Sequence, residues 1–243
     1  MNMMDRLQRA MPTAMPSHIK PMSREEVDAH GRRQVQEFHR TNREKYRENV
    51  VKTLLGRAGL RETHKQCSFD NYCVTCAEQS NALVNAKAWL NRYKQHDICS
   101  FIFAGTTGTG KNHLASAIAN EITANGQSVL LVTVNELMIR MRDTYRDNSP
   151  ISERELIERL STVDLLILDE IGLQRSNDNE ALTINTIIDN RSSDGLAIGI
   201  LTNLNYNELV KQLGERVIDR LKINQAHWVE FNWASYRSNA SEA

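Results

Sequence analysis

The chain has 243 residues, of which 40% are hydrophobic, 25% charged and 6% aromatic. This composition supports a packed core and excludes a chain that is disordered throughout. No apolar run approaches the roughly 18 residues of a membrane-spanning helix, and the amino terminus lacks the apolar stretch of a secretory signal. Four cysteines are too few for a disulfide scaffold, so we expect a cytoplasmic protein that does not bind membranes.

The formal net charge is zero, with 30 basic and 30 acidic side chains, but the charges are unevenly distributed. Residues 1–60 carry 12 Lys and Arg against 7 Asp and Glu, a local excess of 12 minus 7, or +5, which the rest of the chain balances. A polyanion-binding surface over the whole protein is therefore not indicated, whereas a local basic surface is possible.

The amino-terminal quarter differs in pattern from the rest. Residues 1–22 contain three prolines and predict an irregular leader. Residues 23–58 are dominated by charged side chains, with sparse apolar positions between Val27 and Leu55, which predicts helix. Because this apolar stripe is too thin for a core of its own, it either binds a partner's helices or packs on the main domain.

From residue 77 onward, helical and strand-like patterns alternate, which predicts an α/β fold with a mostly parallel sheet flanked by helices. The expected strands are 99–104, 128–133, 163–168 and 197–202, and the expected helices are 78–95, 111–124, helices within 135–161, 180–191 and 206–213, followed by a mixed tail. We therefore divide the chain into a helical region 1–58, a linker 59–76 and an α/β domain 77–243.

A glycine-rich loop follows the first of these strands and opens the next helix. It consists of Gly105, Thr106, Thr107, Gly108, Thr109, Gly110, Lys111 and Asn112, with His113 next in the chain. Glycines let several backbone N–H groups point at one anion, the helix N-terminus adds partial positive charge, and Lys111 supplies a full charge. The loop and His113 therefore predict a nucleoside triphosphate site. Asn112 stands where a Ser or Thr hydroxyl usually meets Mg²⁺, and we expect its amide oxygen to bind the ion.

Polar residues also follow two later strands. Asp169 and Glu170 end the buried strand predicted from residue 163, and Asn203 follows the strand at 197–202. Since the carboxyl ends of parallel strands meet at the ligand crevice, we expect Asp169 in the shell of Mg²⁺ and Glu170 next to the attacking water. Asn203 would hold that water or sense the γ-phosphate, although taken alone it could simply cap the following helix.

Three arginines near the carboxyl terminus are candidates for the same chemistry. Arg216 and Arg220 follow the helix at 206–213, and Arg237 lies close to the end of the chain. An arginine that reaches the γ-phosphate from a neighbouring subunit accelerates hydrolysis by ~10³–10⁵. Taken alone, these residues fit surface charges better.

Together these motifs resemble those of the AAA+ ATPases, and more narrowly the DnaC/IstB-like family, which includes bacterial replicative helicase loaders and transposition helper ATPases. The resemblance covers nearly the whole chain, best for the helicase loaders, and an Asn after the loop Lys fits it. The matching stretches are SFDNY at 68–72, SFIFAGTTGTGKNHLASAI at 100–118, VDLLILDEIG at 163–172, LTN at 201–203, LGERVIDRL at 213–221 and FNWASYRS at 231–238.

The resemblance implies an AAA+ P-loop fold that hydrolyses ATP with Mg²⁺. Arg220 would be the arginine finger that acts on a neighbour, with Arg216 as the weaker candidate, Arg237 would sense the nucleotide in the same chain, and Asn203 would be sensor 1. Because an arginine finger has no role in a monomer, self-association through the ATP site is implied. The amino-terminal region would bind the replicative helicase hexamer.

Single-stranded DNA is the second ligand that the resemblance implies. Arg140, Arg142 and Arg146 surround Tyr145 in a segment where helicase loaders insert an extra helix. A stacking aromatic beside basic side chains suits single-strand binding, and Arg142, Tyr145 and Arg146 are the predicted contacts. The alternative is an amphipathic helix with a solvated basic face. The loop 174–177 is a second expected contact.

The leading hypothesis is an ATP-dependent helicase loader that delivers the replicative helicase to DNA during replication initiation or restart. One alternative is a transposition helper ATPase. The other is a nucleotide-switched protein that binds single-stranded DNA and hydrolyses little ATP.

A cluster of metal-ligating residue types precedes the predicted domain. His64, Cys67, Cys73 and Cys76 have the spacing H-x₂-C-x₅-C-x₂-C, whose outer pairs resemble zinc-ligand spacing. The short middle gap and the aromatic residues nearby favour free thiols over structural zinc.

Overall fold

The computed structural model describes residues 30, 62–97, 99–172, 178–223 and 226–236. Most of the predicted helical region 1–58, the loop 174–177 and Arg237 therefore lie outside the described residues. The domain limits at residues 58 and 76 remain predictions.

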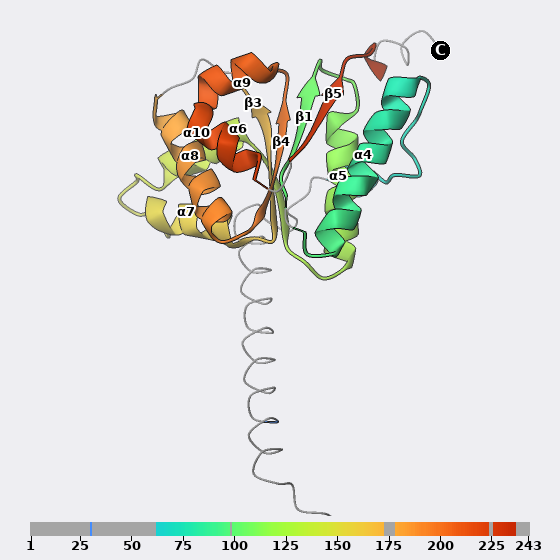
Figure 1. The fold of residues 1–243 in the computed structure, drawn as a ribbon. Coiled ribbons are helices and arrows are strands. Elements are labelled where there is room, and N and C mark those ends of the chain that lie inside the picture. Colours follow the sequence, from blue (N-terminus) through green and yellow to red (C-terminus); the bar gives the residue numbers. More distant parts are fainter. Residues whose placement is uncertain (1–29, 31–61, 98, 173–177, 224–225, 237–243) are drawn as a thin grey trace, which may run out of the picture. The chain divides into compact units, whose positions relative to one another are not determined.

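Strands and helices alternate along the described chain in the predicted order (Figure 1). The strands are β1 (Phe101–Gly105), β2 (Val129–Thr133), β3 (Leu165–Ile171), β4 (Ala197–Thr202) and β5 (His227–Phe231). The helices are α3 (Glu62–Lys65), α4 (Ala77–Lys94), α5 (Lys111–Ala124), α6 (Val134–Asp143), α7 (Glu153–Thr162), α8 (Asp178–Ser193), α9 (Tyr206–Leu213) and α10 (Glu215–Leu221). The helices expected within 135–161 are α6 and α7, and the mixed tail contains α10 and β5.

The strands form one five-stranded sheet in the order β2-β3-β4-β1-β5, and every described pairing is parallel. The predicted α/β architecture is therefore confirmed. β1 lies between β4 and β5, so residues that follow β1 and β4 emerge side by side at the carboxyl edge of the sheet.

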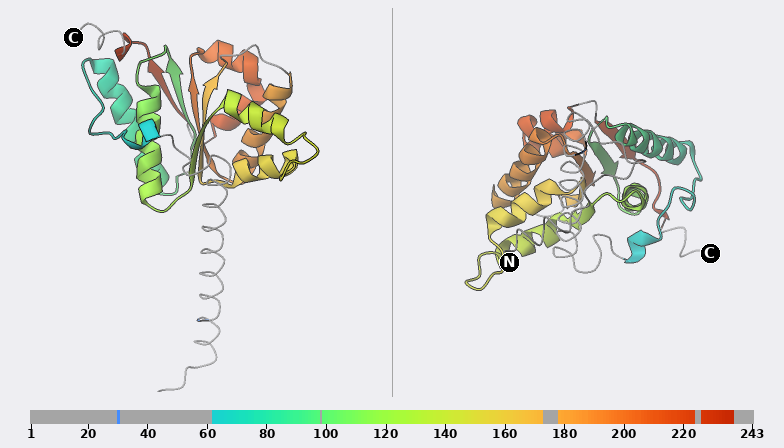
Figure 2. Two further views of the ribbon diagram at one scale, coloured as in Figure 1. Left: turned by 180° about the vertical axis from the view of Figure 1, so that it is seen from behind. Right: turned by 90° about the horizontal axis from the view of Figure 1, so that it is seen from below.

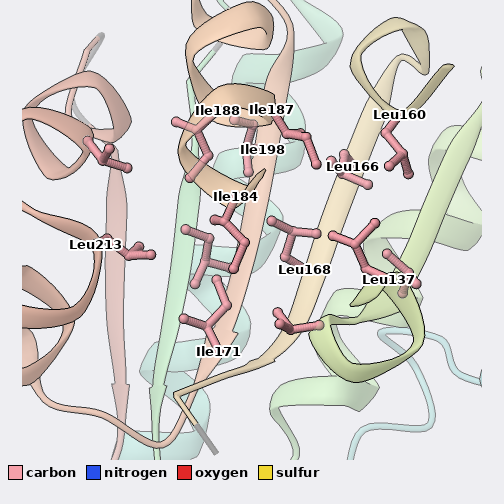
Figure 3. Close-up of a cluster of buried hydrophobic side chains, with 14 of the residues drawn as sticks. Leu137, Leu160, Leu166, Leu168, Ile171, Ile184, Ile187, Ile188, Ile198 and Leu213 are labelled. Carbon is pink, nitrogen blue, oxygen red and sulfur yellow. The ribbon is translucent and has the colours of Figure 1, made fainter. Parts of the chain in front are cut away.

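Helices cover both faces of the sheet, as the two views of Figure 2 show. α4 and α5 pack on one face, where Trp89, Phe101, Phe103 and Phe231 are fully buried. The remaining long helices cover the other face, and Figure 3 shows side chains of α8 directed at those of β3 and β4. Burying both faces explains why the strands are apolar runs without polar alternation.

The strand predicted at 163–168 is longer than expected. β3 continues through the two acidic residues to Ile171, which pairs with Thr202 after an irregularity in the register that begins at Leu168. Ile171 is buried in the core, so its burial favours continuing the strand past Glu170. Glu170 itself adopts φ 62°, a left-handed conformation that few residues other than glycine take up. The acids therefore lie at an irregular strand end, as the sequence predicts, and the strand continues one residue past them.

At the amino edge of the sheet, one fully buried arginine joins three elements. Arg191 of α8 donates hydrogen bonds to the carbonyl oxygens of Leu160 (3.1 Å), Val163 (2.8 Å) and Ala197 (2.6 Å). These carbonyls belong to α7, to the residues before β3 and to the start of β4. Hydrogen bonds from a charged donor offset the desolvation of the guanidinium, so Arg191 fixes this edge of the sheet.

Candidate active site

A pocket of about 490 Å³ opens at the carboxyl ends of β1, β3 and β4. The helices that follow β1 and β4, α5 and α9, lie on opposite faces of the sheet (Figure 1). Neighbouring strands whose connections leave in opposite directions form the crevice in which open α/β sheets bind ligands. The pocket is lined by Asn71, Tyr72, Cys73, Gln79, Thr107, Gly108, Thr109, Gly110, Lys111, Asn112, His113, Asp169, Glu170, Thr202, Asn203 and Tyr236.

The glycine-rich loop wraps the amino terminus of α5. Gly110 immediately precedes this helix and has φ 92°. A Cβ atom at Gly110 would lie 2.8 Å from Cε2 of Tyr72, so both the backbone conformation and the close approach require glycine. The N–H groups of the first turn of α5 have no partners within the helix and can bind an anion there.

Lys111 is buried, with 7% of its surface exposed. Its Nζ donates to the carbonyl oxygens of Gly105 (2.7 Å) and Thr106 (2.8 Å) and to Oδ1 of Asn203 (3.0 Å). Asn203 in turn donates from Nδ2 to Oγ1 of Thr107 (3.2 Å). Burial lowers the pKa of Lys111, and the charge of Asp169 opposes that shift. The structure thus places the predicted sensor 1 residue next to the loop lysine.

Asp169 and Asn112 are in direct contact. Asn112 donates from Nδ2 to Oδ2 of Asp169 (2.7 Å), and the backbone N–H of Glu170 donates to Oδ1 (2.7 Å). Burial raises the pKa of Asp169, although Asn112, the Glu170 N–H and the charge of Lys111 all act in the opposite direction. Carboxylate and amide oxygens are ligands that Mg²⁺ accepts, usually with one or two carboxylates and the substrate phosphates. The residues present therefore fit a magnesium ion.

The side chain of Glu170 is exposed and lines the same pocket. Left-handed backbone conformations at residues other than glycine are costly and gather at functional sites. The conformation of Glu170 places this carboxylate on the pocket wall while its neighbours Asp169 and Ile171 stay buried. This position suits a group that must meet a water molecule rather than the core.

One wall of the pocket was not predicted to bind anything. It contains Asn71, Tyr72, Cys73 and Gln79 from the segment before and at the start of α4. The ring of Tyr72 packs against that of His113 at 5.4 Å, and burial raises the pKa of Tyr72 to about 12. The available signal was the SFDNY stretch at 68–72, to which no role was given.

The carboxyl-terminal segment also contacts the loop. Nε1 of Trp233 donates a hydrogen bond to the carbonyl oxygen of Thr109 (3.0 Å). The backbone N–H of Tyr236 donates to the carbonyl oxygen of Gly108 (2.9 Å). These bonds bring the residue before Arg237 to the pocket. The position of Arg237 itself lies outside the described residues.

Arg220 lies away from the pocket. On α10 it forms an ion pair with Asp189 of α8, and it lines a small hollow with Ser100 and Ile198 at the amino ends of β1 and β4. Lys111 follows the carboxyl end of β1, so the two residues lie at opposite edges of the sheet. Arg220 therefore does not meet the phosphate loop of its own chain. Arg216, on the same helix, is exposed.

The predicted DNA contacts lie on another exposed part of the surface. Arg142 is at the end of α6, and its Nε donates to the carbonyl oxygen of Met138 (3.3 Å). Tyr145, in the turn that follows, is 62% exposed, and Arg146 forms an ion pair with Asp143 (3.1 Å). The structure brings these residues onto one turn but outside the pocket.

The four residues with zinc-like spacing are all described. Cys67, Cys73, Cys76 and the fourth cysteine, Cys99, are free thiols. Within the described ranges, no group of three or more His, Cys, Asp or Glu side chains could hold a metal ion. Nor does any helix in this part of the chain have the length and apolar character needed to cross a membrane.

Comparisons with known proteins identify the family of this chain. Residues 88–243 match the family described as IstB-like ATP binding protein. The chain is 44% identical over 242 residues to the replicative helicase loader DnaC of Escherichia coli strain K12, covering 99% of this chain and 96% of that protein.

Two solved structures have the same fold. A crystal structure of the DnaC helicase loader aligns with a TM-score of 0.61 at 20% identity, over 70% of this chain and 99% of that one. The replication initiator DnaA bound to AMPPCP and single-stranded DNA aligns at 0.58 with 18% identity, over 75% and 56% of the two chains. The fold is therefore that of the AAA+ P-loop proteins, and the chain belongs to the DnaC family of replicative helicase loaders.

Proposed function

We propose that this protein is an ATP-dependent loader of the replicative DNA helicase. The observation that carries the proposal is the meeting of Lys111, Asn203, Asp169 and Asn112 in one pocket, although they come from three separate strand ends. A lysine ammonium group next to hard oxygen ligands is suited to binding a nucleoside triphosphate together with its metal ion.

Each residue has a role in ATP hydrolysis that its position supports. Lys111 and the first N–H groups of α5 bind the phosphates. Asp169 and Asn112 hold magnesium, which when bound neutralises phosphate charge. Glu170 orients and activates the attacking water from the exposed wall, and Asn203 positions the phosphate end through its bond to Lys111. Catalysis of this kind depends on positioning and charge stabilisation.

The partners follow from the family. The relationship to a named helicase loader over 99% of the chain supports the replicative helicase hexamer as the partner of the amino-terminal region. Single-stranded DNA is assigned to Arg142, Tyr145 and Arg146. Because Arg220 lies at the opposite edge of the sheet from Lys111, it can act only on the nucleotide of a neighbouring copy, which implies self-association.

The test is co-purification with a replicative helicase hexamer, using the full chain and a variant that lacks residues 1–58. We expect the full chain to bind the helicase and the truncated chain to lose it while still binding ATP. ATP turnover should increase when single-stranded DNA is added. A full chain that binds ATP but not the helicase would contradict the loading function.

The family match at residues 88–243 favours one other function, a transposition helper ATPase, because the matching family is named after IstB-like proteins. If the same experiment captured a transposase in place of the helicase, the protein would be identified as a transposition helper. ATP binding without measurable turnover, with or without DNA, would instead indicate a nucleotide-switched DNA-binding protein.

A further inference from the structure

The pocket is lined by two chemically different groups of side chains. Lys111, Asp169 and Asn203 are suited to phosphate and metal, as described above. Gln79 lines the same pocket together with Asn71–Cys73, from the part of the chain that precedes β1. Gln79 lies in the first turn of α4 and is only 8% exposed. A polar side chain that is mostly buried on the wall of a ligand pocket can present its remaining hydrogen-bonding groups only to what enters the pocket.

The orientation of the Gln79 amide is fixed by its neighbour. Oε1 accepts hydrogen bonds from the backbone N–H of Thr75 (2.5 Å) and from its hydroxyl (3.0 Å). A backbone N–H can only donate, so the oxygen of the amide must face Thr75 and the reversed placement is excluded. The Nε2 group, which carries two donors, makes no hydrogen bond within the part of the chain that the structure describes. Gln79 therefore offers the pocket a donor and no acceptor.

We propose that Gln79 selects the nucleobase, by donating from Nε2 to N1 of adenine. This inference rests on the proposed function, in which the pocket binds a nucleoside triphosphate. N1 is a hydrogen-bond acceptor in adenine, whereas guanine and hypoxanthine carry N1–H, a donor, at the same place. Once a base fills the pocket, a donor that faces another donor is left without a partner, and sites of this kind reject the wrong ligand strongly.

The surroundings of Gln79 suit a flat aromatic ligand. Tyr236 lines the same pocket and is 60% exposed, and an aromatic ring at this position can stack on a base. Cys73 is on the same wall as Gln79 and is exposed. In the proposed function the phosphates bind next to Lys111, so we expect the base to meet these other lining side chains.

The first test changes the ligand and leaves the protein intact. Calorimetry measures the affinity of the wild-type chain for ATP, 1-deaza-ATP and 7-deaza-ATP in magnesium buffer. We expect 1-deaza-ATP, which lacks the N1 acceptor, to bind about tenfold more weakly than ATP, and 7-deaza-ATP to bind like ATP. Equal affinities for ATP and 1-deaza-ATP would overturn the inference and leave the proposed function intact. Failure of the wild type to bind any of the three would overturn both.

The second test changes the protein. Gln79→Met keeps the size of the side chain and removes the donor, so this variant should bind ATP and 1-deaza-ATP equally. Gln79→Glu, measured at pH 8, keeps an oxygen for Thr75 and presents an acceptor, so it should shift selectivity from ATP toward ITP. A structural role alone would weaken all nucleotides alike. A Gln79→Met variant that is folded by circular dichroism and keeps the wild-type ratio of affinities would contradict the assignment.

Discussion

Lys111 and Asp169 are each only 7% exposed and are held by hydrogen bonds within the chain, whereas Tyr145 is 62% exposed and Arg146 extends into solvent. Both groups were predicted from sequence as binding residues. The first group is assembled by the sheet, because the ends of β1, β3 and β4 converge. The second group lies on the exposed turn after α6, and Arg220 makes a partly exposed ion pair with Asp189 away from the pocket.

The difference separates two kinds of function. Residues fixed in a buried pocket can act on a small ligand in a single chain, and their energetic contribution is set by the fold. Residues on the surface contribute only when a second macromolecule covers them, since exposed charges are screened by solvent. Substitutions in the buried group should therefore reduce nucleotide binding, whereas substitutions on the surface should reduce functions that need a second macromolecule.

The largest expected effect concerns Arg220, which we propose to act on the nucleotide of a neighbouring copy. Arg220→Ala should lower the rate of ATP hydrolysis by about 10³, the lower limit for loss of an arginine finger, measured by steady-state turnover at high protein concentration. ATP affinity should be unchanged, because Lys111 lies at the opposite edge of the sheet. Arg216→Ala, on the same helix, serves as the matched control and should keep its turnover. Full turnover by the Arg220 variant would refute its role.

The next largest effect is expected for Lys111, in the buried pocket. Lys111→Ala should weaken ATP binding by about 100-fold or more, because hydrogen bonds to charged groups contribute roughly 1.5–3 kcal/mol each and about 1.4 kcal/mol corresponds to tenfold. Calorimetry at low protein concentration measures this without self-association. Lys94→Ala removes an exposed ion pair with Glu121 and should bind ATP normally. Equal affinities of the two variants would place the phosphates elsewhere.

The third effect is expected for Tyr145, on the exposed turn after α6. Tyr145→Ala should weaken binding of single-stranded DNA about tenfold, because stacking of one base on an aromatic side chain contributes ~1–3 kcal/mol. Fluorescence anisotropy with a labelled oligonucleotide measures the change, and ATP affinity should be unaffected. Tyr206→Ala removes another exposed tyrosine, on α9, and should bind DNA like the wild type. Equal losses of DNA affinity in both variants would contradict a specific stacking role for Tyr145.

The smallest effect concerns pH. Burial raises the pKa of Asp169 above its ordinary value of 3.8. The folded state then holds this proton more tightly than the unfolded state, so the free energy of unfolding falls as pH rises from 3.8 through the raised pKa. Asp169→Asn should remove this slope, since an amide does not titrate in this range. Urea unfolding across that range measures it, and the exposed Asp147→Asn should retain the wild-type slope.

Much of the fold could be predicted because each buried strand is a continuous apolar run between turn signals. The gathering of Lys111, Asp169 and Asn203 was also predictable, since parallel strands bring their carboxyl ends to one edge. The short α10 and the edge strand β5 were left as a mixed tail, because seven and five residues give too little periodicity.

Other features had no signal in sequence. Gln79 reaches the pocket from α4, an element that precedes the first strand, and no strand-end rule points to it. Arg191 was not singled out either, because its partners are backbone carbonyls, which every residue type carries. The conformation of Glu170 depends on how β3 pairs with β4 beyond the irregularity, a property of tertiary structure.

The burial of Arg191 has a practical consequence for experiments on this protein. Mobile counterions cannot reach a guanidinium with no exposed surface, so added salt should leave the amino edge of the sheet as it is. Contacts with nucleic acid phosphates behave in the opposite way, because their strength falls steeply with ionic strength. If the proposed DNA contacts form, a potassium chloride titration should therefore release a bound oligonucleotide while the secondary structure of the protein stays constant.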